Sequence, residues 1–124
     1  MEFWIVIYIL FVHYVADFIF QTNWMALNKS KSNLALLSHV ATYSVLLFVG
    51  LSLYFGLTSN VFLLVLINGF AHFTTDYITS RMNAYFWTHE KRSFFWWTIG
   101  LDQWIHAATL IALSKWLLFS NLTA

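Results

Sequence analysis

The chain has 124 residues, of which 60% are hydrophobic and only 9% are charged. Soluble domains carry about 25% charged residues, so these few charges could not cover a water-soluble globule of this size. The net charge of +1, without a basic stripe, excludes a nucleic-acid surface. The chain has no cysteine, which excludes disulfides and thiolate metal sites and leaves the redox compartment open. We therefore predict an all-α integral membrane protein whose main partner is the lipid bilayer.

Long apolar stretches set the predicted architecture. A helix needs about 20 mainly apolar residues to cross a hydrocarbon core of roughly 30 Å. Such stretches cover residues 3–25, 34–57, 61–82 and 94–118. They lack the period-two alternation of barrel strands, and the N-terminus lacks the features of a cleaved signal peptide. Since short connections make sequential helices antiparallel, we expect one transmembrane domain over residues 1–124, folded as a four-helix bundle.

Basic residues give the expected orientation of the bundle. They gather in or beside the first and third connections, the third running roughly over residues 83–93: Lys29, Lys31, Arg81, Lys91 and Arg92. The N-terminus and the second connection carry none, and only Lys115 lies near the C-terminus. The positive-inside rule therefore places the first and third loops in the cytoplasm and both termini outside.

The two halves of the chain, about 1–58 and 59–124, share polar residues at the same spacing. The matching segments are Phe11–Ile19 with Phe70–Ile78, and His39–Thr42 with His106–Thr109. Chance matches arise in apolar segments, but the shared H-x-x-x-D spacing favours a duplication. Two hairpins that enter the membrane in the same direction form parallel repeats about an axis along the membrane normal. The two H-x-x-x-D helices are then expected to face each other across the bundle axis.

All three Asp and four of the five His lie inside the expected spans. A carboxylate at the bilayer centre costs roughly 2.5–3.5 kcal/mol, so intramembrane ionisable residues indicate a functional site. Three His–Asp pairs are four residues apart, so each pair projects from one helix face. The candidate metal ligands are His13, Asp17, His39, His72, Asp76, Asp102 and His106.

Imidazole and carboxylate together suit a divalent transition metal, with zinc as the first candidate and Mn, Fe or Co as alternatives. The candidate ligands outnumber those of one tetrahedral site, so either two ions share the pocket or some residues support one ion. Asp102 is expected as a ligand or as the general base, oriented by Gln103. Four further residues are expected to support the ligands: Gln21, Asn68, Thr42 and Thr109. In the competing interpretation, the His–Asp pairs only join helices or relay protons.

The run from His13 to Gln21, then His39, then His72-x-x-x-Asp76 and Asp102-Gln103-x-x-His106, resembles a family of small bacterial and phage membrane proteins. That family has no assigned activity, and the resemblance covers nearly the whole chain. It implies the same site residues and a bacterial inner membrane location. More loosely, the H-x-x-x-D hairpins are similar to predicted membrane-bound metal-dependent hydrolases of bacteria.

Three functions fit this pattern, and the sequence leaves open whether the protein is an enzyme. The first is a metal-dependent hydrolase that acts on a lipid or lipid-linked substrate from the cytoplasmic side. The second is an ion or proton transport protein, which would require a homo-oligomer because four helices leave little room for a path. The third is a non-enzymatic membrane interaction factor whose polar core serves only for folding.

Overall fold

The computed structural model describes residues 1–119, and within them it is all-α, as predicted, with no strand. The elements are α1 (Phe3–Tyr14), η1 (Val15–Ile19), α2 (Asn23–Asn28), α3 (Asn33–Phe55), α4 (Ser59–Thr88), α5 (Arg92–Ser114) and η2 (Lys115–Phe119), where η denotes a π-helical turn. Residues 120–124, which end the predicted domain and its second half, lie outside the described residues.

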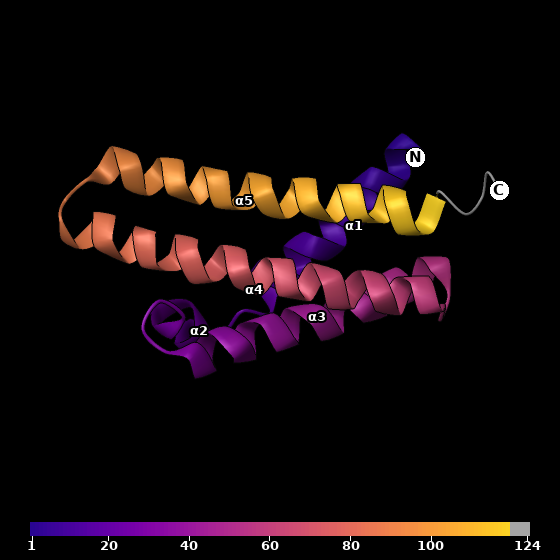
Figure 1. Cartoon of the computed structure of the whole chain (residues 1–124), viewed down its shortest axis with the longest axis horizontal. Coiled ribbons are helices and arrows are strands. Elements are labelled where there is room, and N and C mark those ends of the chain that lie inside the picture. The colour runs from indigo at the N-terminus through magenta and orange to yellow at the C-terminus, as the bar shows by residue number, and fades with distance from the viewer. Residues whose placement is uncertain (120–124) are drawn as a thin grey trace.

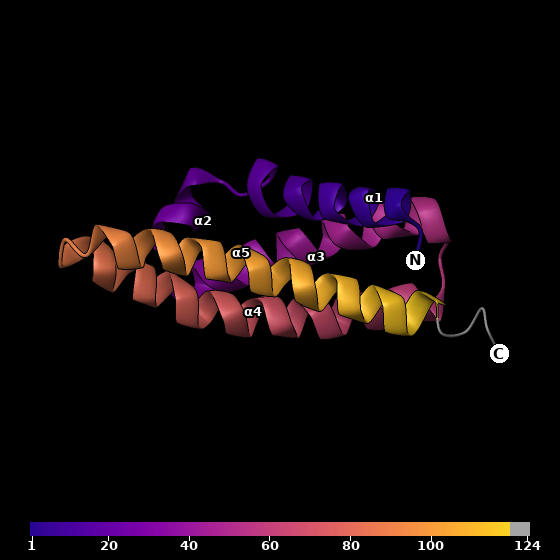
Figure 2. The same cartoon turned by 90° about the horizontal axis from the view of Figure 1, so that it is seen from above.

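The long helices α3, α4 and α5 lie side by side (Figure 1), and α1 lies over them in the perpendicular view (Figure 2). α1 contacts α3 and α5, and α4 also contacts α3 and α5. α1 and α4 are therefore diagonal to each other across the bundle. α2 and the α4–α5 turn lie at one end, whereas the N-terminus and the α3–α4 turn lie at the other (Figure 1).

The interior has two parts along the bundle axis. Near the N-terminus, an apolar core packs α1 against α3, α4 and α5, through Ile9, Leu47, Leu64 and Leu110, all fully buried. The buried polar side chains follow next along the axis, toward the end that holds α2. The apolar core thus fixes the distances between the helices, and the polar side chains fill the space that this packing sets.

The first predicted span is interrupted. The stretch 3–25 is not one continuous helix, because α1 passes into the π-helical turn η1 and the helix ends at Ile19. Thr22 then starts a new short helix, α2, by accepting a hydrogen bond from the Met25 amide at 3.3 Å. Threonine and asparagine favour helix starts because their side chains compete for backbone groups, and residues 22–23 supply both.

The third connection is shorter than predicted. α4 continues to Thr88 and α5 begins at Arg92, so only residues 89–91 connect them, rather than 83–93. Glu90 has a φ of 58°, and Lys91 closes the turn by donating to the Phe86 carbonyl at 2.9 Å. α3 and α4 are each long and apolar enough to cross a membrane, by length and composition.

Candidate metal centre

Six of the seven candidate ligands meet in the middle of the bundle, and each is at most 6% exposed. They are His13 from α1, Asp17 from η1, His39 from α3, His72 and Asp76 from α4, and His106 from α5. The spacing of four residues explains the pair on α4, because it puts both side chains on one helix face. The other four arrive from separate elements, so the packing of the helices brings them together.

Asp17, His39 and His72 form the first group with metal-ligand spacing. Nε2 of His39 and Nε2 of His72 lie 3.0 and 3.4 Å from Asp17 Oδ1, and 3.2 Å from each other. Metal bonds of about 2.0–2.1 Å in a tetrahedron place ligand atoms about 3.3–3.4 Å apart. The three atoms therefore already have the separation that one divalent ion requires.

Asp76 lies next to this group. Its Oδ2 lies 3.2 Å from Nε2 of His39 and 3.6 Å from Nε2 of His72. His39 and His72 thus each lie close to two carboxylates, those of Asp17 and Asp76.

His72, Asp76 and His106 form a second group with metal-ligand spacing, which shares His72 with the first. The other oxygen of Asp76, Oδ1, lies 3.5 Å from Nε2 of His106. The Asp76 carboxylate therefore faces His39 and His72 with one oxygen and His106 with the other. A carboxylate in this position can bridge two ions, which in two-metal sites lie about 3.5–4 Å apart.

Nε2 of His106 and Nε2 of His13 are buried and have no hydrogen-bond partner among the described residues. A buried polar atom left without a partner costs about 1–3 kcal/mol, so such atoms indicate a missing partner. For His106, a divalent ion beside Asp76 would be that partner. The nitrogen and oxygen donors of both groups match the chemistry of a first-row divalent metal.

His13 lies beside the two groups and belongs to neither. Its Nε2 is 3.9 Å from Asp17 Oδ2, the carboxylate oxygen that faces away from His39 and His72. Its Nδ1 lies 3.4 Å from the Tyr43 hydroxyl, which donates a 2.8 Å hydrogen bond to Asn68 Oδ1. Asn68 therefore supports the cluster through Tyr43, in line with its predicted supporting role.

The structure does not bring Asp102 into either group, although the sequence predicted it as a ligand or base. His106 Nδ1 donates to the Asp102 backbone carbonyl at 2.7 Å and lies 3.6 Å from its carboxylate. That carboxylate accepts hydrogen bonds from the Thr79 hydroxyl and, at 2.9 Å, from Gln103 Nε2. Asp102 thus orients His106 so that Nε2 faces Asp76, as residues behind metal ligands commonly do.

No hydrogen bond joins the three other predicted supporting residues to the ligand groups in the described part of the chain. Gln21 follows the end of η1, so it does not continue the helical face of His13 and Asp17. The Thr42 hydroxyl donates to the Ser38 carbonyl at 2.9 Å, within its own helix. Thr109 is half-buried on α5, three residues beyond His106.

Sequence reasoning missed three residues at the cluster. Tyr43 is 1% exposed and stacks on His72, with ring centroids 4.0 Å apart. The sequence indicates Lys29 as a topology signal and, less strongly, as a residue that attracts an anionic headgroup, yet its Nζ lies 2.9 Å from Asp76 Oδ2. Tyr43 follows His39 by four residues and Thr79 follows Asp76 by three, so helical spacing could have found both. Nothing local to Lys29 indicates its partner, which lies 47 residues away.

Together the fold and the cluster define a class of protein: a helical bundle with buried imidazoles and carboxylates at metal-ligand spacing. The chain belongs to the family described as "Protein of unknown function (DUF3307)", which matches residues 5–124. The expected resemblance to a family without an assigned activity is confirmed to this extent. No curated protein and no solved structure matches the chain.

Proposed function

We propose that this protein is an intramembrane metal-dependent hydrolase that acts on a lipid or lipid-linked ester from the cytoplasmic side of a bacterial inner membrane. The observation that carries the proposal is the arrangement around Asp76. Its two oxygens face different imidazoles of two overlapping ligand groups, whose buried residues come from the four elements η1, α3, α4 and α5.

The distribution of polarity supports insertion in a membrane. The ionisable side chains of the cluster are buried, whereas large apolar side chains face outward on the same helices, including Leu37 and Leu53 of α3 and Leu66 and Phe70 of α4. Soluble monomers rarely expose contiguous apolar patches larger than a few hundred Å². The buried polar cluster and the apolar exterior favour a bundle of four membrane-crossing helical segments, in which α1 and η1 form the first.

The chemistry available to the buried residues supports the proposal of hydrolysis. A bound divalent ion would supply Lewis acidity and lower the pKa of a water molecule to about 7. Asp17, His39 and His72 would hold the ion, with Asp76 beside them, and Asp102 fixes the orientation of His106. His13 is the best-placed proton acceptor, because its Nε2 faces Asp17 and has no hydrogen-bond partner among the described residues.

Metal content tests the first half of the proposal. Protein purified in mild detergent is equilibrated with buffered zinc, and bound metal is measured by elemental analysis. We expect at least one ion per chain, its loss in His72→Ala, and its retention in His89→Ala, since His89 is exposed in the α4–α5 turn. Circular dichroism verifies that both variants are folded. Folded wild-type protein that binds no divalent metal would overturn the proposal.

Product formation tests the second half. Phospho- and acyl-ester lipids are offered to the reconstituted protein, and products are followed by mass spectrometry. Chelation should stop the reaction, and added metal should restore it. If the reconstituted protein instead conducts ions or protons into liposomes and forms no product, the transport alternative is correct.

A further inference from the structure

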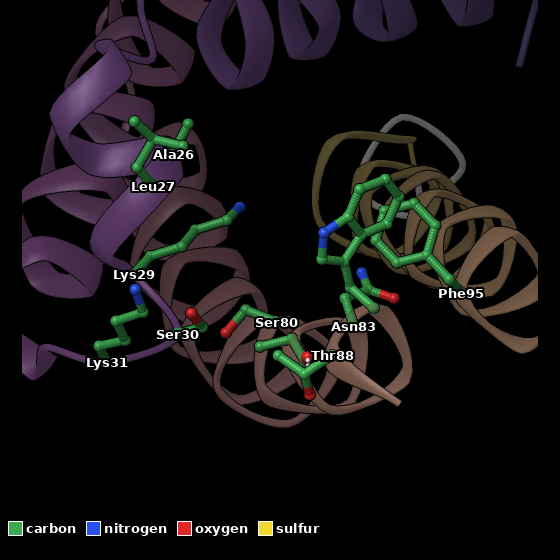
Figure 3. Close-up of a pocket in the computed structure, with 11 residues that line it drawn as sticks. Ala26, Leu27, Lys29, Ser30, Lys31, Ser80, Asn83, Thr88 and Phe95 are labelled. Carbon is green, nitrogen blue, oxygen red and sulfur yellow. Dashed lines mark hydrogen bonds between the residues drawn. The ribbon is translucent and has the colours of Figure 1, made fainter. Parts of the chain in front are cut away.

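A cavity of about 430 Å³ lies at the basic end of the bundle, between α2 and the ends of α4 and α5 (Figure 3). This volume falls in the range of small-molecule pockets, about 300–1,000 Å³. Lys29 extends from the end of α2 toward the side that carries Asn83 and Phe95, and Lys31 lies beside it (Figure 3). α2 packs against α3, so its other side is left to border the cavity.

The inner part of the cavity is suited to an anion. Lys29 and Lys31 both line it, and none of its described lining residues is acidic. Ser80, only 8% exposed, also lines it, and its hydroxyl has no hydrogen-bond partner among the described residues. Asn83 Oδ1 is likewise buried without a partner in the described chain, and a half turn of the amide would present its NH₂ instead. Two cations and two unpaired polar side chains thus face the same space.

The outer part of the cavity is apolar. Leu27 of α2 lies on one side, and Trp87 and Phe95 lie on the other, with ring centroids 5.0 Å apart. Along α4, Ser80 is about 6 Å and Trp87 about 16 Å beyond Asp76, at 1.5 Å per residue. On α4, the polar Ser80 is therefore nearer to the candidate metal centre than the apolar Trp87.

We propose that this cavity binds an amphiphile with a phosphomonoester headgroup, with the phosphate at Lys29, Lys31 and Ser80 and the chain along Trp87 and Phe95. Two ammonium groups match the dianionic phosphate, for which lysine is a common protein partner. Lys29 also contacts Asp76 at 2.9 Å, so one side chain separates the headgroup from the candidate ligands. The binding of the amphiphile is independent of the proposed function, but its role as the substrate of the metal centre rests on that function.

Calorimetry with three probes tests this site on the full chain in zwitterionic nanodiscs, with empty nanodiscs as the blank. Octyl phosphate should bind, whereas inorganic phosphate and the neutral octyl glucoside should each bind at least about tenfold more weakly. A hydrogen bond to a charged group is worth about 1.5–3 kcal/mol, so Lys31→Ala should weaken octyl phosphate binding by about 10- to 100-fold. Lys91→Ala removes the same charge from the exposed α4–α5 turn and should leave binding unchanged.

Several outcomes would overturn the inference. Equal losses in Lys31→Ala and Lys91→Ala would mean a general attraction of anions to the basic end. Equal binding of inorganic phosphate would mean a site for free phosphate, and equal binding of octyl glucoside would mean a merely apolar groove. Metal content measured on the same samples separates the two proposals: bound zinc without octyl phosphate binding overturns only this inference, and octyl phosphate binding without bound metal overturns only the metal centre.

Discussion

The two H-x-x-x-D motifs have the same residues at the same spacing, but their backbones differ. The second motif lies on α4, which continues without interruption over 30 residues. The first lies across α1 and η1, and its Asp17 is in a π-helical turn, after which the chain breaks and restarts as α2. Isolated π turns inside helices are often found at functional sites.

The difference shows how two motifs with the same spacing can take two roles. On α4, His72 faces both ligand groups, and the same helix continues to the cavity at Ser80. In the first half, His13 stands outside the groups, and the break allows Lys29 to reach Asp76. Both halves therefore supply candidate ligands, Asp17 and His39 from the first and His72, Asp76 and His106 from the second. Only the first half adds an imidazole outside the groups, that of His13, and the cation of Lys29.

The largest expected effects come from replacing the histidine of each motif, which tests whether His72 is a ligand and His13 is not. His72→Ala should lower zinc affinity by more than about 100-fold, because even residues behind the ligands are worth about 10–100-fold. His13→Ala should keep the metal and lower hydrolysis by on the order of 10²–10⁴, as for the loss of a proton acceptor. Chelator competition and product release measure the two effects. If His13→Ala loses metal as fully as His72→Ala, the two motifs are equivalent.

A glycine in each half tests how tightly the hairpins pack. An added Cβ at Gly50 of α3 would lie 2.4 Å from Val12 Cγ1 of α1, whereas one at Gly100 of α5 would meet nothing within 4 Å. Gly50→Ala should destabilise the protein by about 1–3 kcal/mol, since a branched side chain in a packed core cannot move aside. Gly100→Ala should be neutral or stabilise it by up to about 1 kcal/mol. Equal unfolding midpoints of the two variants in detergent would contradict this packing of α1 on α3.

The support behind His106 has no counterpart in the first half, where Ala35 occupies the position four residues before His39. Thr79→Ala removes the hydroxyl that holds Asp102 and should lower zinc affinity by about 10–100-fold. Thr75→Ala is the matched control, because that hydroxyl donates to the Ala71 carbonyl of its own helix. Chelator competition on both variants gives the comparison, and an unchanged affinity in Thr79→Ala would remove Asp102 from the site.

The short helix α2 has no counterpart in the second half of the chain. We expect the smallest effect from a substitution at its start. Thr22→Ala removes the side chain that accepts from Met25, at a typical cost of about 1 kcal/mol, and should speed amide exchange in α2 up to about tenfold. Thr58→Ala removes the equivalent contact with Val61 at the start of α4, where exchange beyond the first turn should stay unchanged. Identical exchange of α2 in Thr22→Ala and wild type would show that tertiary contacts alone hold this helix.

The sequence by itself determined which groups are available to the site. Its low charge and long apolar runs predicted an all-helical chain, and helical spacing predicted that His72 and Asp76 share one face. Both follow from local rules, namely the period of the helix and the cost of burying an ionisable side chain. The same spacing would have revealed Tyr43 and Thr79.

Only the tertiary structure decided the distances between helices and hence the roles. It separates Asp102 from the ligand groups by turning its carboxylate to Thr79 and Gln103, and it joins Lys29 to Asp76 across 47 residues. The helix end at Ile19 likewise depends on whether the chain continues its helical hydrogen bonds or starts a new helix that Thr22 caps. The apolar content of the sequence does not settle this choice. Spacing fixes which side chains share a helix face, whereas side-chain packing between helices fixes which faces meet.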